Sequence, residues 1–428
     1  MFPPWITPVL CWNLIQSLTG LTVAFTASDS RLRPFVAALT ALLACTLQSN
    51  IQTHFAATGP SGPLVAMCWV NVLNAFDLLV LSRASYSAQV AYQRTKAEKK
   101  DKTPTQGTTS QSNTLSSKLR FALELPYNYR RIDTPWSNPT GPRSTPPQNP
   151  RQREQSKSKS TFLLRSTATL LLAGAIIHLL TLDPSDPHLT RALRKLDTSK
   201  NVLLLPFRDA IAHKHDLLVQ ALFTLSFGLI TRAAIVGGHT AAAILAVSLG
   251  DSPANWPPIF EPLHEARSLH GLWGKSWHQI LRIPLTSNAT FLASSILGLH
   301  PKSRGAHWLR VTFAFTVSGV IHSLCDIGFG VPLHETGGFH FYTLQIFGFV
   351  VESVVGAVYR AVVKQSRALG GGVGVGRAVE KVVGYVWVLA FLAWSTPVWI
   401  NPILVGLAGD GTKVMSPWLG LSPSVYEL

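Results

Sequence analysis

The chain has 428 residues, of which 47% are hydrophobic and only 14% are charged. Soluble domains carry about 25% charged residues, so this composition excludes an ordinary soluble protein and indicates a membrane protein. The formal net charge is +16, but basic residues are not interleaved with aromatic ones as in known nucleic-acid-binding modules, which argues against nucleic acid as a partner.

Apolar stretches long enough to cross a bilayer recur along the chain, since one transmembrane helix needs about 20 largely apolar residues. The first stretch lacks a basic start, so we expect a retained membrane helix and not a signal peptide. The stretch 216–249 has about twice the length of one span and contains Gly237-Gly238, which predicts two helices there. The fold class expected is all-α, a polytopic transmembrane helical bundle of about eight helices. The expected spans are 5–27, 34–48, 64–82, 162–182, 216–249, 307–328, 340–359 and 382–400.

Composition divides the chain into three parts. N-terminal transmembrane helices occupy 1–83, a polar and basic stretch occupies 84–160, and a transmembrane core occupies 161–428. Between Arg94 and Lys159 there are 14 basic and 5 acidic residues, a net charge of +9. Because this stretch has little apolar surface to bury, we expect it to be partly disordered. Loops rich in Lys and Arg tend to stay cytosolic, so we expect a multi-pass integral membrane protein with this loop in the cytosol.

Polar and aromatic residues gather in one stretch beside the membrane segments. Tryptophan commonly anchors a chain at the membrane interface, but anchoring alone needs no His-Gln pair flanked by basic residues. Hydrogen-bonding side chains beside positive charge are suited to bind an anionic acyl carrier and to polarise its carbonyl. The members of this patch are Trp273, Lys275, Trp277, His278, Gln279 and Arg282.

His322 lies inside an apolar stretch that is expected to be a membrane span. An ionisable group at bilayer depth is expensive and usually marks function, although a histidine bonded to a backbone carbonyl within the core is the alternative. An imidazole with an ordinary pKa of about 6.5 is largely neutral at cytosolic pH and can remove the proton of a hydroxyl. We therefore expect His322 and the Trp-His-Gln patch to serve one active site.

Two other chemistries find little support. The chain has 14 histidines, but it lacks H-x-x-x-H and H-x-x-H-H boxes, and neither His264-Glu265 nor His334-Glu335 continues as H-E-x-x-H, so no metal site is predicted. No G-x-S-x-G nucleophile elbow occurs either, which leaves a covalent serine mechanism without support.

Four patches follow one another between residues 124 and 352. The first is Asn128-Tyr-Arg-Arg-Ile-Asp-Thr-Pro-Trp136, and the second is Leu272-Trp-Gly-Lys-Ser-Trp-His-Gln279 with Arg282. The third runs from Phe291-Leu-Ala-Ser-Ser-Ile-Leu-Gly298 into Thr312-Phe-Ala-Phe-Thr-Val-Ser-Gly-Val-Ile-His322. The fourth is Phe341-Tyr-Thr-Leu-Gln345 followed by Glu352. Together they resemble the wax-synthase-like branch of the membrane-bound O-acyltransferases, in particular fungal members that acetylate secondary metabolites.

The resemblance implies that His322 matches the family's catalytic histidine. It also implies that Trp277-His278 matches the second signature position, which is often Asn in relatives that act on lipids. Arg131 and Asp133 stand where the family element N-x-R-G-I-G-T-P-W has glycines, so we expect a different loop shape there. Lys275 stands where Arg is usual, which keeps the charge but loses the bidentate fork.

By this resemblance we expect acyl transfer from acyl-CoA, most simply acetyl-CoA, to a hydroxyl of a lipophilic alcohol such as a terpenoid. His322 is expected to be the general base, and His278 and Gln279 to orient the thioester. No cofactor is expected to be bound, since acetyl-CoA is a co-substrate, and the endoplasmic reticulum is the expected membrane. The residues expected to bind the donor are Trp273, Lys275, Trp277 and Arg282.

Three alternatives remain. A long-chain wax-ester synthase would use the same chemistry with a different donor. A transporter would need intramembrane polar residues along a path and often repeated halves, whereas here they concentrate in two patches. A membrane scaffold without activity would never consume the thioester.

Overall fold

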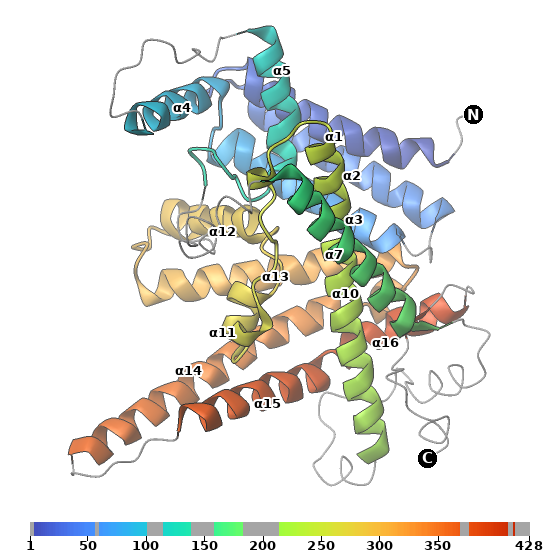
Figure 1. Cartoon of the computed structure of the whole chain (residues 1–428), viewed down its shortest axis with the longest axis vertical. Coiled ribbons are helices and arrows are strands. Elements are labelled where there is room, and N and C mark those ends of the chain that lie inside the picture. Colours follow the sequence, from blue (N-terminus) through green and yellow to red (C-terminus); the bar gives the residue numbers. More distant parts are fainter. Residues whose placement is uncertain are drawn as a thin grey trace. The chain divides into compact units, whose positions relative to one another are not determined.

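The computed structural model describes residues 4–55, 60–100, 114–137, 158–182, 214–368, 376–409 and 414–415. Nearly all of this part of the chain is helical (Figure 1), and eight of its helices are long and apolar enough to cross a membrane. The prediction of an all-α bundle of about eight membrane helices is confirmed. Strand structure in the described ranges is limited to β1 (Thr181–Leu182), which pairs antiparallel with β2 (Val414–Met415).

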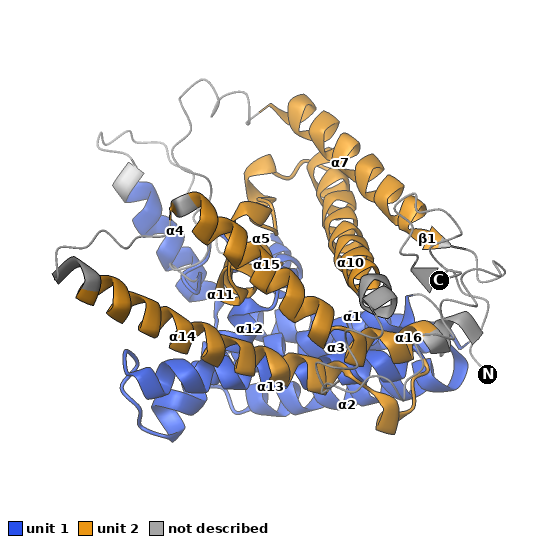
Figure 2. Ribbon diagram, turned by 90° about the horizontal axis from the view of Figure 1, so that it is seen from below, with its two compact units in different colours: residues 1–141, 280–329 blue, residues 142–279, 330–428 orange. Residues whose placement is uncertain are grey.

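The chain forms two compact units, coloured separately in Figure 2. Unit 1 comprises Met1–Gly141 and Ile280–Phe329, and unit 2 comprises Pro142–Gln279 and Gly330–Leu428. Each unit therefore joins segments that are far apart in the sequence. The division of the chain into 1–83, 84–160 and 161–428 stays a prediction.

In unit 1, α1 packs on α2, and α3 packs on both α2 and α13. Two glycines allow the close approach of α3 to α13: a Cβ on Gly62 would meet the Phe329 ring, and one on Gly328 would lie 3.1 Å from the Cα of Gly62. Small residues let membrane helices approach closely, so these contacts fix the helix that carries His322. The elements of unit 1 are α1 (Ile6–Phe25), α2 (Leu32–His54), α3 (Ser61–Phe76), η1 (Asp77–Leu81), α4 (Tyr86–Lys100), α5 (Leu115–Glu124), η2 (Leu125–Tyr127), α12 (Arg282–Thr290), η7 (Phe291–Ile296) and α13 (Arg304–Gly328).

In unit 2, α10 packs on α7, α15 and α16, and α14 contacts α11, α15 and α16. Several short turns follow α10 and lead to the Trp-His-Gln patch. The elements of unit 2 are α7 (Lys159–Leu180), β1, α10 (Lys214–Ser248), η4 (Pro253–Asn255), η5 (Leu263–Glu265), α11 (Leu269–Gly271), η6 (Leu272–Ser276), η8 (Leu333–Glu335), α14 (Gly338–Ala368), α15 (Arg377–Ser395), α16 (Pro397–Gly409) and β2.

The prediction that 216–249 contains two helices is wrong, because α10 runs unbroken over Lys214–Ser248. A glycine weakens a helix by about 1 kcal/mol relative to alanine, but an interrupted helix in lipid would leave backbone polar groups without partners. Gly237 is buried against α7, where an added Cβ would lie 3.6 Å from the Cβ of Ala173. Gly237 therefore packs against α7, Gly238 is exposed, and the pair does not end the helix.

The polar stretch 84–160 is helical where it is described, since it contains α4 and α5 and the beginning of α7. The predicted disorder concerns mainly 101–113 and 138–157, which lie outside the described residues. α5 packs on α1, and a Cβ on Gly20 would collide with the carbonyl of Ala122. This part of the polar stretch is therefore held by the first membrane helix.

Candidate functional site

The predicted site residues fall in both units. His322 and Arg282 belong to unit 1, whereas Trp273, Lys275, Trp277, His278 and Gln279 belong to unit 2. The described residues contain no group of three or more His, Cys, Asp or Glu that could hold a metal ion.

The His322 ring is held by its own helix, α13. Its Nδ1 lies 2.7 Å from the carbonyl oxygen of Ser318, one turn earlier. A carbonyl can only accept a hydrogen bond, so Nδ1 carries the proton and donates it. In the neutral ring the lone pair then resides on Nε2, the nitrogen that points away from the helix backbone. The hydrogen bond therefore fixes the tautomer in which Nε2 is the basic atom.

One further polar side chain lies close to His322 along α13. Asp326 is fully buried and follows His322 by four residues, which places it on the same face of the helix. Asp326 is absent from the site residues predicted from the sequence. A buried aspartate inside a predicted membrane span was the available signal, because such a residue is costly unless it is partnered or functional.

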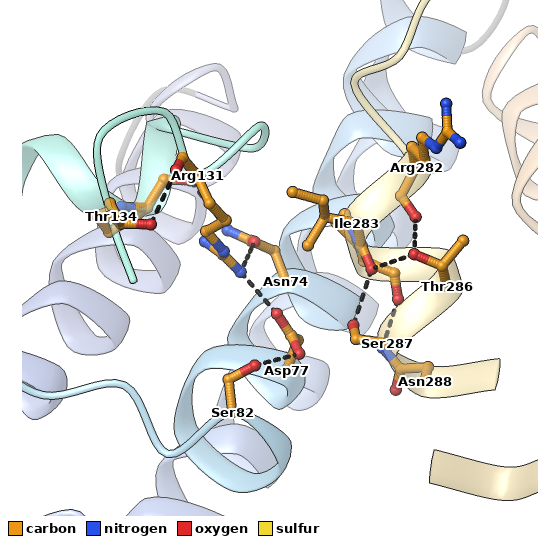
Figure 3. Close-up of polar contacts among 12 residues, drawn as sticks. Asn74, Asp77, Ser82, Arg131, Thr134, Arg282, Ile283, Thr286, Ser287 and Asn288 are labelled. Atoms are coloured by element: carbon orange, nitrogen blue, oxygen red, sulfur yellow. Dashed lines mark hydrogen bonds and ion pairs between the residues drawn. The ribbon is translucent and has the colours of Figure 1, made fainter. Parts of the chain in front are cut away.

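Arg282 begins α12 in unit 1, and its side chain is half-buried. Figure 3 shows the Arg282 side chain pointing away from Thr286 and Ser287, whose hydroxyls donate to the backbone of the same helix at 2.6 and 2.8 Å. Burial lowers the pKa of the Arg282 guanidinium, although arginine stays charged near neutral pH. Arg282 therefore contributes a positive charge at the start of α12.

The loop that contains Arg131 and Asp133 adopts left-handed backbone conformations at both positions, with φ of 53° and 57°. This region of backbone space favours glycine and costs other residues roughly 1–2 kcal/mol. Arg131 and Asp133 thus adopt a backbone conformation that glycine would adopt at lower cost, and the expected difference in loop shape from the family stays a prediction. Asn128 closes the loop, since its side chain donates to the carbonyl of Ile132 at 2.8 Å and accepts from the Ile132 N–H at 2.9 Å.

The Arg131 side chain is fully buried in unit 1 and forms an ion pair with Asp77 at 2.8 Å. The same nitrogen donates to Asn74 Oδ1 at 2.8 Å, and Ser82 donates to the other oxygen of Asp77 at 2.9 Å (Figure 3). Burial lowers the pKa of Arg131, and the charge of Asp77 opposes this effect. The pair joins the loop to the end of α3; the loop is recognisable in the sequence, whereas the pair is not.

The unit 2 group lies on a short helical turn made of α11 and η6, residues 269–276, and on the three residues that follow it. The η6 part is a π-helical turn, in which Trp277 N–H donates to the carbonyl of Leu272 at 2.7 Å. Such turns occur often at functional sites. Ser268 caps the start, since its hydroxyl accepts from the Gly271 N–H at 2.9 Å.

Aromatic rings surround this turn within unit 2. Trp273 and Trp277 meet edge to face with ring centroids 5.6 Å apart, and the Phe260 ring lies 5.9 Å from the His278 ring. Edge-to-face pairs add about 0.5–1.5 kcal/mol beyond area burial and hold rings in defined orientations. Trp399 stacks on Phe341, which in turn contacts Trp273. Helix α16 therefore contributes to the packing of this turn, although no residue of α16 was among the predicted site residues.

Gln279 is buried and bonds mainly to backbone. Its amide nitrogen donates to the carbonyl of Trp277 at 2.8 Å, and its own N–H donates to the carbonyl of Ile259 at 3.2 Å. These bonds shape the turn that presents Trp277 and His278. Their geometry favours a role of Gln279 in orienting this turn.

Lys275 is exposed and pairs with Glu265 at 2.9 Å. The hydrogen bond from Lys275 and its positive charge lower the pKa of the Glu265 carboxyl. The Glu265 carboxylate is therefore ionised at neutral pH. Its ion pair with Lys275 is lost only when the pH falls through the lowered pKa of Glu265 and the carboxyl becomes protonated. The positive charge predicted for donor binding is thus partly balanced by a neighbouring acid.

Replacement of Lys275 by Gln is expected to raise the KM for acyl-CoA about 3–5-fold, because an exposed ionic contact contributes up to about 1 kcal/mol. Glu265→Gln should lower the same KM, since it exposes the Lys275 charge. Both shifts should shrink at high salt. Initial rates at varied acyl-CoA and two ionic strengths measure this, with the exposed Lys381→Gln as control. Equal KM values for the wild type and both variants would contradict the role of Lys275.

Residues 256–344 match the model of the membrane bound O-acyl transferase family. This range contains His322, Arg282 and the whole Trp-His-Gln patch. No solved structure matches the chain.

Several known proteins are similar to this chain. Acetyltransferase spyB of Aspergillus fumigatus is 34% identical over 179 residues, which are 40% of this chain and 30% of that protein. Acetyltransferase aurG of Calcarisporium arbuscula is 26% identical over 408 residues, 92% of this chain and 93% of that protein. Acetyltransferase fsoF of Humicola fuscoatra is 28% identical over 315 residues, 70% and 71% of the two chains. Residues 256–344 thus match the membrane bound O-acyl transferase family, and the relatives named acetyltransferases support an O-acyltransferase whose described residues contain eight helices able to cross a membrane.

Proposed function

We propose that this protein transfers an acetyl group from acetyl-CoA to a hydroxyl of a lipophilic alcohol, such as a terpenoid, with His322 as general base. The observation that carries the proposal is the hydrogen bond from His322 Nδ1 to the Ser318 carbonyl, which leaves the lone pair on Nε2. The relatives named as acetyltransferases support acetyl as the transferred group.

The proposed reaction is one direct displacement. His322 Nε2 takes the proton of the acceptor hydroxyl as its oxygen attacks the thioester carbonyl, and the C–S bond then breaks. The imidazolium returns the proton to the leaving thiolate, so the products are the ester and CoA. No acyl-enzyme forms, which agrees with the absence of a nucleophile elbow from the sequence.

The patch in unit 2 is proposed to serve the donor. His278 would steady the charge that develops on the thioester oxygen, Gln279 would hold the turn that presents it, and Lys275 and Arg282 would attract the anionic CoA. Trp273 and Trp277 would pack against the apolar part of the donor. The protein would work in the endoplasmic reticulum membrane with the basic stretch 84–160 in the cytosol, where acetyl-CoA is present.

The test is acyl transfer in membranes from cells that express the chain. Labelled acetyl-CoA and a lipophilic alcohol extract are incubated with these membranes, and the labelled ester is identified by mass spectrometry. Labelled ester is expected with acetyl-CoA and much less with palmitoyl-CoA. A preference for palmitoyl-CoA would indicate a wax-ester synthase instead, and donor that is never consumed would contradict an acyltransferase.

A further inference from the structure

Two charged side chains inside membrane spans of unit 2 have no role in the proposed mechanism. Arg232 lies on α10 within the span Ala221–Ser248, and Glu352 lies on α14 within the span Leu333–Gln365. Ionisable residues at membrane depth are expensive and usually functional. Both side chains bond to the helical turn 269–276, one at each end.

Glu352 binds the N-terminal end of this turn. Its carboxylate accepts from the backbone N–H groups of Leu269 and His270 and from His270 Nδ1 at 2.9 Å. Trp387 on α15, which contacts α14 (Figures 1 and 2), donates to the same carboxylate at 2.9 Å. The first N–H groups of a helical turn have no partner within it, and they carry partial positive charge. A carboxylate accepts the hydrogen bonds of these N–H groups, and its negative charge balances their partial positive charge.

Arg232 binds the opposite end. Its guanidinium donates to the carbonyl of Ser276, the last residue of the turn, at 3.0 Å, and to the carbonyl of Glu261 at 3.3 Å. It also lies 4.2 Å from the centre of the Phe260 ring, which packs edge to face on Trp277 and His278. Terminal carbonyls of a helical turn carry partial negative charge, so a cation is the favourable partner.

A third contact lies between the two ends. Gln345 is fully buried on α14, and its Oε1 accepts from Trp273 Nε1 at 3.1 Å. Gln345 precedes Glu352 by seven residues, which is two helical turns, so both lie on one face of α14. On the same face, a Cβ added to Gly348 would collide with Leu269. This face of α14 is therefore shaped to receive the turn.

We propose that Glu352 and Arg232 are positioning residues that clamp the two ends of the turn 269–276 and so set the orientation of Trp277 and His278 toward the acyl donor. This inference rests on the proposed donor role of that patch. Neither residue touches the reacting atoms in the proposed mechanism. A misplacement of about 1 Å can cost about 10²-fold in rate, so loss of either clamp should act mainly on kcat.

The test combines kinetics with hydrogen–deuterium exchange on the full-length protein in detergent. Glu352→Ala and Arg232→Ala should each lower kcat about 10²-fold, with little change in KM for the alcohol. Exchange in peptides covering 266–279 should become faster, while peptides of α13 stay unchanged. Glu352→Gln keeps an oxygen that can accept from the backbone and should recover most of kcat, as Arg232→Lys should recover part.

Two variants serve as matched controls. Glu380 on α15 accepts from Tyr359 at 2.7 Å but does not contact the turn, and Arg165 on α7 is exposed within its span. Alanine at either position should leave kcat and exchange in 266–279 unchanged.

Unchanged exchange in both Glu352→Ala and Arg232→Ala would overturn the clamp, and faster exchange without loss of kcat would overturn its positioning role. Faster exchange in all peptides would show a purely structural role. The exchange measurement remains informative even if the wild type transfers no acetyl group, which would refute the proposed function alone.

Discussion

Replacement of His322 by alanine is expected to abolish acetyl transfer while the protein still folds. Loss of a general base costs about 10²–10⁴-fold in rate, which would bring product below detection in a membrane assay. The hydrogen bond from Nδ1 to Ser318 lies within one turn of α13, so its loss should cost only about 0.5–1.5 kcal/mol of stability. The measurements are the initial rate of labelled ester formation and the amount of monodisperse protein after solubilisation.

His307 provides the matched control for this prediction. It lies on the same helix, α13, but is exposed. His307→Ala should therefore keep the wild-type rate, whereas His322→Ala should not. A His322→Ala protein that retains more than about one tenth of the wild-type rate would refute the general-base role, since even the lower bound for such a group is about 10².

The helical membrane architecture could be predicted from the sequence because apolar length alone identifies a span. All eight expected stretches overlap one of the eight spans in the described residues. The failure at 216–249 has a clear physical origin. Gly237-Gly238 predicts a break, but a broken helix in lipid would leave backbone polar groups without partners, so α10 continues through the pair, and Gly237 packs beside Ala173. Sequence alone does not show which neighbour is present.

The candidate site was predictable only where residue types were unusual for a membrane. His322 and the Trp-His-Gln patch stood out, and Gln345 and Glu352 belong to the fourth patch, but the contacts by which these residues hold the turn could not be predicted. Arg232 is separated from Ser276 by 44 residues, and Glu352 is separated from His270 by 82 residues, so their role depends on contacts that are distant in the sequence. The buried pair of Arg131 and Asp77 is likewise separated by 54 residues. Contacts of this kind follow from packing and not from local pattern.

Separate removal of either partner of the Arg131–Asp77 pair is expected to destabilise unit 1 strongly. Both side chains are almost completely buried, at 0% and 1% exposure, and breaking a buried pair leaves an uncompensated charge that costs about 3–5 kcal/mol. Arg131→Met and Asp77→Leu should each lower the unfolding midpoint, on the order of 10 °C. Unit 1 contains the buried thiols Cys11, Cys68 and Cys325, so a thiol-reactive dye reports its unfolding once the exposed Cys45 is replaced by Ser.

The double variant Arg131→Met/Asp77→Leu separates the charge effect from general damage to the core. A buried ion pair can often be replaced by apolar side chains of similar volume without loss, so the double variant should be more stable than either single one. The exposed pair of Lys96 and Asp133 in the same region is the control, because such pairs contribute at most about 1 kcal/mol. Asp133→Gly should be neutral or stabilising, since glycine relieves a φ of 57° at a cost of only that exposed pair. If the two single losses simply add in the double variant, the charges are not coupled, and the loop is held at Asp77 by packing and not by the ion pair.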